Sequence, residues 1–257
     1  MSFLKYFCLF QNLLCSKMEN LTVDQLKTQL FNASRSGNLQ ELQALMQKGV
    51  NLDSKDRYGG TPLHYAVLHE KETIVELLLE KGVNIDERTS NEMTSLQIAI
   101  LKNQLSMVKI LLKHGADVEV KGRLDFSPLH IAIIDRNVPL AKILIEYGAD
   151  VNSPTVDGRI PLIRTIHRKD LGMSEILLQN GARSDIIAWQ GQTALHYAVS
   201  GKNKKAFDML LRYGASLRTK NADGRTALEL ALDRIDLKLE FFKTISHYDE
   251  KCIMFLS

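Results

Sequence analysis

Leucine recurs at intervals of 33 residues along most of this 257-residue chain. Six leucines share this register: Leu63, Leu96, Leu129, Leu162, Leu195 and Leu228. Five glycines follow a second series with the same interval: Gly82, Gly115, Gly148, Gly181 and Gly214. A fixed period of this length indicates one supersecondary unit repeated along the chain, in which each copy buries its apolar face against its neighbours. The pattern therefore predicts an array of stacked repeats.

The residues around the repeated leucine predict a short first helix in each repeat. A hydroxyl at Thr61 can satisfy helix N–H groups, and Pro62 suits the first helical position because its missing N–H costs nothing there. Leu63, Ala66 and Val67 follow with helical spacing and form one apolar stripe. A small alanine in this stripe lets the neighbouring helix approach closely.

The second half of the repeat predicts another helix, over about residues 73–80, with apolar residues Val75, Leu77, Leu78 and Leu79. Gly82 follows and can take the left-handed conformation that ends a helix. The next segment is rich in Asp, Asn and Gly, which favour turns, so we expect it to form a projecting hairpin, here called a finger.

Three segments carry a more specific signature, and they read Thr61-Pro62-Leu63-His64-Tyr65-Ala66, Ser127-Pro128-Leu129-His130-Ile131-Ala132 and Thr193-Ala194-Leu195-His196-Tyr197-Ala198. At these residues the chain resembles the ankyrin repeat family. The resemblance implies an all-α repeat solenoid of helix-turn-helix units with projecting β-hairpin fingers. It covers residues 21–235 in about seven repeats, preceded by an apolar lead-in at 1–20 and followed by a capping helix or tail at 236–257.

Some repeats depart from this pattern. The fingers around Glu92 and Asp125 lack the usual glycine, so we expect both to be irregular. The fourth copy of the first helix contains Arg164 and Thr165 where a hydrophobic residue and an alanine are usual. Local weakness or contact with a partner would explain that change.

Composition adds limits on partners and compartment. The formal net charge is +3, and Lys and Arg alternate with Asp and Glu along the array, so no basic face for nucleic acid is predicted. The three cysteines, Cys8, Cys15 and Cys252, lie outside the repeats and have no disulfide or zinc-ligand spacing. The simpler interpretation of these cysteines is a protein of a reducing compartment, which is the cytoplasm, with the nucleus as a second location.

Residues 1–17 form an apolar stretch behind one basic residue, Lys5. The stretch is too short to span a bilayer. It has the features of a poor signal peptide, which would imply secretion, although Gln11 and Asn12 interrupt its apolar centre and no clean cleavage site follows. An upstream-start extension, or a lead-in that packs on the first repeat, is the competing interpretation.

The chain offers no catalytic motif, and we expect neither an enzyme nor a cofactor or metal site. His64, His130 and His196 recur two repeats apart, too far to share a metal ion. By resemblance to the family, a histidine at this position hydrogen-bonds the turn of the adjacent repeat. The aspartates before finger glycines are expected to form turns, and they are Asp56, Asp157 and Asp223.

The resemblance implies that partners bind the concave face, at the finger tips and the ends of the first helices. On this chain those positions are Arg57, Tyr58, Leu68, Met93, Leu101, Arg123, Leu124, Phe126, Ile134, Arg168, Trp189 and Gln192. Aromatic residues, Met and Arg are enriched in interface cores, so Trp189, Tyr58, Phe126 and Arg123 are the expected anchors. We expect one or more protein partners, no nucleic acid, no membrane span and a monomer.

Two functional alternatives stay open beside a simple interaction scaffold. One is a regulatory adaptor, such as an IκB-like inhibitor of a transcription factor or a substrate receptor of a ubiquitin ligase. The other is a secreted or host-directed effector, which depends on cleavage of residues 1–17. The resemblance also implies that Asn152, in the segment Ala149-Asp150-Val151-Asn152, is a candidate for asparagine hydroxylation.

Overall fold

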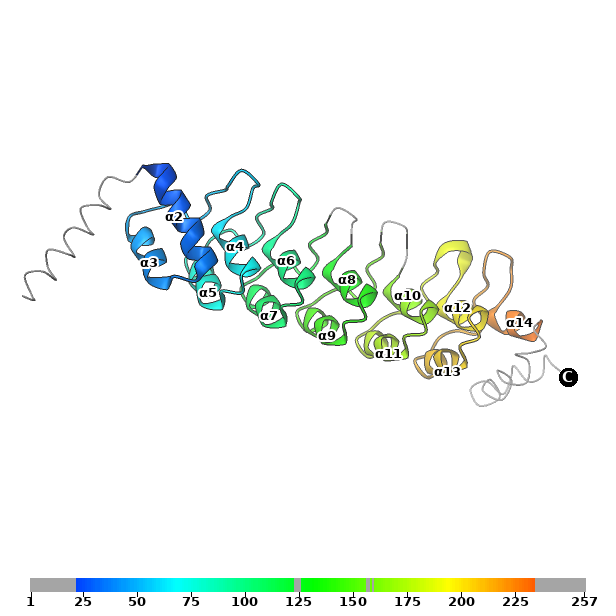
Figure 1. Ribbon diagram of the computed structural model, residues 1–257. Helices are drawn as coiled ribbons and strands as arrows, with labels where there is room; N and C mark the ends of the chain where they lie inside the picture. Colours follow the sequence, from blue (N-terminus) through cyan, green and yellow to red (C-terminus); the bar gives the residue numbers. More distant parts are fainter. Residues whose placement is uncertain (1–21, 123–125, 156–157, 159, 234–257) are drawn as a thin grey trace, which may run out of the picture. The chain divides into compact units, whose positions relative to one another are not determined.

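The computed structural model describes residues 22–122, 126–155, 158 and 160–233 (Figure 1). Over these residues the chain forms thirteen α-helices, one short 3-10 helix and an isolated bridge between Lys220 and Thr226. It divides into two compact units, one ending at Asp117 and one beginning at Val118. The expectations for residues 1–20, for the tail from 236, and for Arg123, Leu124, Asp125 and Asp157 lie outside the described residues.

The N-terminal unit contains three helix pairs. They are α2 (Val23–Ser36) with α3 (Leu39–Gln47), α4 (Pro62–Leu68) with α5 (Glu72–Glu80), and α6 (Ser95–Leu101) with α7 (Leu105–Lys113). The first helices α2, α4 and α6 contact one another in series, and α5 contacts α7 in a second row. Loops project from the first-helix row in Figure 1.

The first repeat differs from the others in the length of its first helix. α2 has 14 residues, whereas α4 has seven. It begins with a capping box, in which the N–H of Thr22 donates to the side chain of Gln25 and the N–H of Gln25 donates back to the Thr22 hydroxyl. The first repeat is thus built on an extended, well-capped helix.

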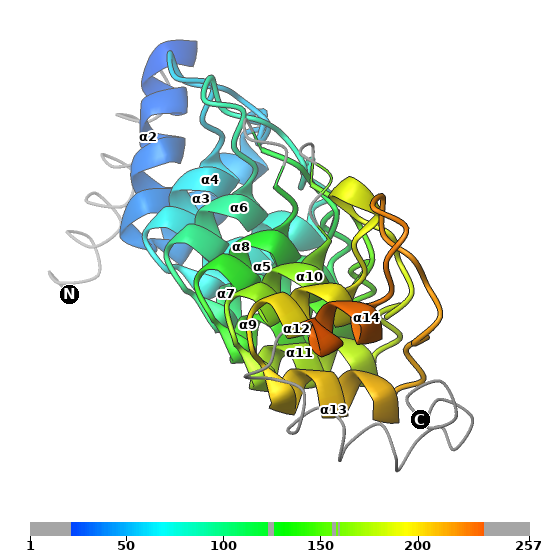
Figure 2. The ribbon, with the colours of Figure 1, turned by 90° about the vertical axis from the view of Figure 1, so that its right-hand side faces the viewer.

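The C-terminal unit continues the same two-row pattern. Its helices are α8 (Pro128–Ile134), α9 (Val138–Glu146), α10 (Pro161–His167), α11 (Leu171–Gln179), α12 (Ala194–Ser200), α13 (Lys204–Arg212) and α14 (Ala227–Leu232). The first helices α8, α10, α12 and α14 contact in series, and α11 contacts α13. In Figure 2 the loops of this unit extend from the first-helix row, away from α11 and α13.

The predicted apolar stripes form the core of each repeat. In α4, Leu63, Ala66 and Val67 are buried, and Val75 and Leu78 of α5 are completely buried against them. The stripe alanine is likewise fully enclosed in α6, α8 and α12, which allows close packing of successive first helices.

Both helices of a repeat end in the same way, but with different residues. The second helices are followed by glycines with positive φ, such as Gly82 at +76°, as the glycine series predicts. The first helices end in a Schellman motif whose left-handed residue is mostly not glycine. In five repeats this residue has φ between +52° and +58°, and these residues are Glu70, Asn103, Arg136, Lys169 and Lys202.

The two described fingers of the N-terminal unit are tight turns closed by backbone bonds rather than paired strands. In the first, the N–H of Asp56 donates to the carbonyl of Gly60, and Gly59 has φ +70°. In the second, the N–H of Thr89 donates to the carbonyl of Met93, and Glu92 has φ +60°. The expected irregularity around Glu92 is therefore wrong, because Glu92 adopts the left-handed conformation that the turn requires.

Candidate protein-binding face

The surface made by the ends of the first helices and by the fingers is here called the inner face of each unit. On the N-terminal unit it presents Tyr58 and Leu101, with exposed fractions of 58% and 61%, and a less exposed Leu68. The guanidinium of Arg57 lies over the ring of Tyr58, 4.7 Å from its centroid. Met93 is half-buried. Four predicted partner-binding residues of this unit are therefore substantially exposed to solvent.

The Tyr58 finger is held rigidly by Asp56. One oxygen of its carboxylate accepts the N–H groups of Tyr58 and Gly60, at 2.9 and 2.8 Å, and the other accepts the hydroxyl of Tyr65 at 2.5 Å. Burial raises the pKa of Asp56, but the Tyr65 hydroxyl, the two N–H groups and Arg57 together hold that pKa below its ordinary value. The hydrogen bond from the Tyr65 hydroxyl to Asp56 raises the pKa of Tyr65. The structure confirms Asp56 as a turn former that also ties the finger to α4.

The last described finger uses a different residue for this purpose. The side-chain oxygen of Asn221 accepts the N–H groups of Asp223 and Arg225, at 3.1 and 3.0 Å. Asp223 therefore lies two residues after Asn221, whose side chain accepts the N–H groups of the turn. The expectation that Asp223 itself has this role is wrong. In the register of the repeat, Asn221 corresponds to Asp56.

Two of the recurrent histidines, His64 and His196, have the structural role that the resemblance implies. Nδ1 of His64 receives both the N–H and the hydroxyl of Thr61, at 3.1 and 2.8 Å, so it is unprotonated, and Nε2 bonds the carbonyl of Met93 at 3.2 Å. His196 makes the same set of contacts, ending on the carbonyl of Arg225. Burial lowers the pKa of His64, against the raising effect of the Met93 carbonyl. In α6 a neutral Gln97 occupies this position and bonds the N–H of Thr94.

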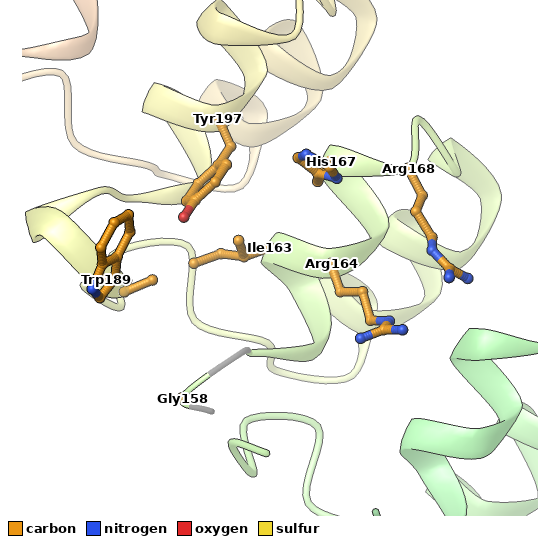
Figure 3. Close-up of a pocket in the computed structure, with 8 residues that line it drawn as sticks. Gly158, Ile163, Arg164, His167, Arg168, Trp189 and Tyr197 are labelled. Atoms are coloured by element: carbon orange, nitrogen blue, oxygen red, sulfur yellow. The ribbon is translucent and has the colours of Figure 1, made fainter. Parts of the chain in front are cut away.

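On the C-terminal unit the inner face is hollowed between α10, α12 and the finger that carries η1 (Trp189–Gly191). The depression has a volume of about 640 Å³. Its lining residues are Gly158, Ile163, Arg164, His167, Arg168, Ala188, Trp189 and Tyr197. Figure 3 shows Tyr197 extending from α12 toward Ile163, with Trp189 on the finger to one side and Arg164 on the other. With 74% of its surface exposed, Trp189 forms an open wall of this site.

The depression lies where the repeat pattern breaks. In α4, α8 and α12 a hydroxyl residue and a histidine form the polar start of the helix, whereas α10 has Ile160 and Ile163 at these positions. Arg164 lies where α4 and α12 carry tyrosine. The break thus replaces a buried polar pair with two buried isoleucines and places a cation on the inner face.

The unusual Thr165 is compensated within the core. Its hydroxyl donates to the carbonyl of Leu162, and it accepts the hydroxyl of Ser174 from α11, both at 2.8 Å. A buried hydroxyl costs little when it has partners. The change at Thr165 is therefore matched by a change at Ser174, which supplies a hydrogen-bond partner inside the core.

Arg168 is fixed by a reciprocal contact with α8. Its Nη1 donates to the carbonyl of Ile134 at 2.9 Å, while Nη2 of Arg136 donates to the carbonyl of Arg168 at 3.3 Å. Each guanidinium thus binds a carbonyl at the C-terminal end of the neighbouring first helix, where a positive charge is favourable. Because arginine has five N–H donors, the bond to Ile134 orients the Arg168 side chain without using all of its donors.

The structure brings two of the predicted residues, Trp189 and Arg168, into one depression. Three others in this unit, Phe126, Ile134 and Gln192, are half-buried, and the Phe126 ring lies 6.2 Å from that of His130. Sequence reasoning missed Ile163 and Tyr197 as lining residues. Arg164 was noticed only as a departure from the repeat, although that departure was the signal for the site.

The candidate modification site at Asn152 is engaged in the link between repeats. Its Oδ1 accepts the N–H of Arg183 at 2.8 Å, and its Nδ2 donates to the carbonyl of Gly181 at 3.1 Å. Asp53 and Asp86 accept the N–H of the corresponding residue in the next repeat in the same way. The Asn152 side chain is therefore part of the structural ladder in this conformation.

Over the described residues, no group of three or more His, Cys, Asp or Glu side chains is arranged to hold a metal ion. Within the same residues, none of the helices has the length and apolar character needed to cross a membrane.

Comparison with known proteins agrees with this architecture. A family model described as "Ankyrin repeats (3 copies)" matches residues 2–89, 30–122, 81–155 and 162–252. The fowlpox virus ankyrin repeat protein FPV223 is 43% identical over 51 residues, which are 20% of this chain and only about a third (36%) of the viral protein.

Solved structures are similar over a larger part of the chain. The ankyrin repeat domain of Bcl-3, described as a unique member of the IκB protein family, superposes with a TM-score of 0.71 at 27% identity, covering 84% of this chain and 97% of that domain. The human ASB11 ankyrin repeat domain gives a TM-score of 0.57 at 26% identity, covering 86% and 97%. The all-α repeat solenoid is thus confirmed, and with the family model matching most of its length the chain belongs to the ankyrin repeat family.

Proposed function

We propose that this chain is a non-catalytic interaction scaffold that binds a partner protein through the inner face. The observation that carries the proposal is the depression on the C-terminal unit, which joins an exposed tryptophan, a tyrosine and two arginines. These residue types dominate the energetics of protein interfaces. Ankyrin repeats generally mediate protein–protein interaction, and solenoids bind partners on their extended faces.

The exposed apolar side chains support the same face. Trp189, Leu101 and Tyr58 are highly exposed, although none of them is needed to fill the core of a repeat. Isolated exposed hydrophobic residues are ordinary, but on the C-terminal unit Trp189 lines one depression together with the oriented Arg168. Such a surface gains free energy when a partner covers it.

A regulatory adaptor is the second candidate, because the Bcl-3 domain, of the IκB family, superposes over most of this chain. The adaptor differs from a plain scaffold in needing a second recruiting surface besides the inner face. From the positions of the cysteines outside the repeats, we place either activity in the cytoplasm or nucleus and expect a monomer.

The test is affinity capture from native lysate with the full chain, followed by identification of bound proteins and reconstitution with each purified candidate. A variant carrying Tyr58→Ala, Leu101→Ala and Trp189→Ala is expected to lose the partner while keeping its helical signal and melting temperature. Tyr147→Ala with Tyr213→Ala removes two exposed tyrosines at the ends of second helices and serves as the matched control.

Retention of the reconstituted partner by the folded triple variant would refute binding through the inner face. Loss in the control variant alone would assign binding to the second helices. An adaptor would yield two proteins, of which only one depends on the three substituted residues.

A further inference from the structure

The apolar part of the depression is confined to one side of it. Trp189 on the finger, Tyr197 on α12 and Ile163 on α10 lie together in Figure 3. Ile187 precedes Trp189 by two residues on the same finger and is 60% exposed, although it does not line the depression itself. The volume of about 640 Å³ is large enough for an aromatic or branched aliphatic side chain with its flanking backbone.

The opposite side of the depression is cationic. Arg164 and Arg168 project from α10, with His167 between them in sequence. The turns between first and second helices of this unit extend the positive charge, because they carry Arg136, Arg168, Lys169 and Lys202 against two acidic residues, Asp135 and Asp170. One carboxylate oxygen of Asp170 accepts the N–H of Met173 at the start of α11.

The arginine at this edge is oriented before any partner arrives. The bond from Arg168 to the carbonyl of Ile134 fixes the guanidinium beside the depression. A planar guanidinium recognises carboxylates through paired N–H donors, and a side chain that is already ordered loses less entropy on binding. Apolar surface on one side and ordered positive charge on the other define the chemistry of the occupant.

We infer that the depression binds an extended acidic segment of a partner protein, in which an aromatic or branched aliphatic side chain contacts Trp189, Tyr197 and Ile163 while a neighbouring carboxylate pairs with Arg168. The inference rests on the proposed function and specifies the chemistry of the partner. Complementary charge also steers the segment toward the site, so the affinity falls as salt rises.

The test selects ligands without assuming a partner. A library of short random peptides displayed on phage is panned against the full chain, and enriched peptides are synthesised. We expect them to combine Asp or Glu with Phe, Tyr, Leu or Ile. Because Trp189 is the sole tryptophan, its emission reports occupancy directly, and we expect a shift to shorter wavelength on binding.

Substitutions on both sides of the contact then locate it. Arg168→Glu and Trp189→Ala are each expected to weaken binding about tenfold or more. Lys142→Glu makes the same charge change on an exposed residue of α9, outside the depression, and is expected to leave the affinity unchanged. Replacing the acidic residues of the peptide by Asn or Gln should weaken the affinity by a similar factor. This change leaves the protein unaltered, so it tests the contact even if Arg168→Glu disturbs the fold.

Enriched peptides that lack acidic residues, or that bind a folded Arg168→Glu variant equally well, would overturn the inference. So would tighter binding of a single-stranded RNA oligonucleotide at this site. Peptides whose binding is lost with Tyr58→Ala and Leu101→Ala, but not with Trp189→Ala, would overturn the inference while leaving the proposed function intact. If no peptide is enriched and no captured partner depends on the inner face, both fail.

Discussion

Lys169 closes the Schellman motif at the end of α10 in a left-handed conformation, with φ +58°. The N–H of Asp170 donates to the carbonyl of Thr165 and the N–H of Lys169 to that of Ile166, the bonds that define this motif. Glycine is the usual residue at such a position because it has no Cβ. We therefore predict that Lys169→Gly stabilises the protein.

The magnitude follows from two opposing effects. A side chain in the left-handed region costs roughly 1–2 kcal/mol, and glycine relieves this strain. Glycine also gives the unfolded chain more freedom, which costs about 0.5–1 kcal/mol. The expected net gain is about 0.5–1 kcal/mol. Lys169 is exposed, so the loss of its side chain adds little to this difference.

Urea unfolding followed by far-ultraviolet circular dichroism measures the effect, with Lys169→Ala as the matched control. Alanine removes the lysine side chain but keeps Cβ, so its stability should stay within about 0.5 kcal/mol of the parent. The glycine variant should melt about 1–4 °C above the parent, given the usual scaling for a chain of this size.

A glycine variant no more stable than the alanine variant would refute the reasoning. That result would mean that the left-handed conformation at residue 169 stores no strain. The same argument would then fail for the corresponding residues of the other repeats.

Three other changes test separate features of the fold. His64→Gln removes a buried titratable group but keeps an acceptor for the N–H at the helix start. The pKa of His64 in the folded protein lies below its ordinary value of 6.5, so the unfolded state takes up the proton first as the pH falls. The parent should therefore lose stability relative to the variant as the pH falls through 6.5. Equal urea midpoints of the two proteins at every pH would contradict this. Glu92→Gly should raise the free energy of unfolding by about 0.5–1 kcal/mol, because the residue has φ +60° and its ion pair is exposed. A lower urea midpoint than that of the parent would count against strain in that finger. Thr165→Ala and Ser174→Ala should each lower the free energy of unfolding by about 1 kcal/mol, because each removes one member of the buried hydroxyl pair. In a double-mutant cycle the double variant should lose less than the sum of the two single losses. Full additivity would argue against an interaction between the two hydroxyls.

The sequence predicted those parts of the fold that depend on local chemistry repeated in register. Pro62 marks the start of α4, Gly82 follows α5, and the stripe from Leu63 to Val67 is buried as expected. The glycine rule also misled, because Glu92 forms the same turn as Gly59. Backbone bonds formed by the whole repeat outweigh the preference of a single residue.

The candidate site could be predicted only in part. Trp189 was singled out because of its residue type and its place on a finger, and Arg168 because of its place at a helix end. Tyr197 and Ile163 carried no such mark, and Ile163 reads as an ordinary apolar residue until its neighbours are known. Their common role appears only when α10, α12 and the finger lie side by side.

The sequence by itself determined the repeat, its two helices and its turns, because these depend on residues a few positions apart and recur every 33 residues. Tertiary structure decided which exposed side chains share a surface. Trp189 and Ile163, 26 positions apart in sequence, line the same depression, and Arg168 reaches the carbonyl of Ile134 across 34 positions. Such contacts follow from the stacking of one repeat on the next, which no local propensity encodes.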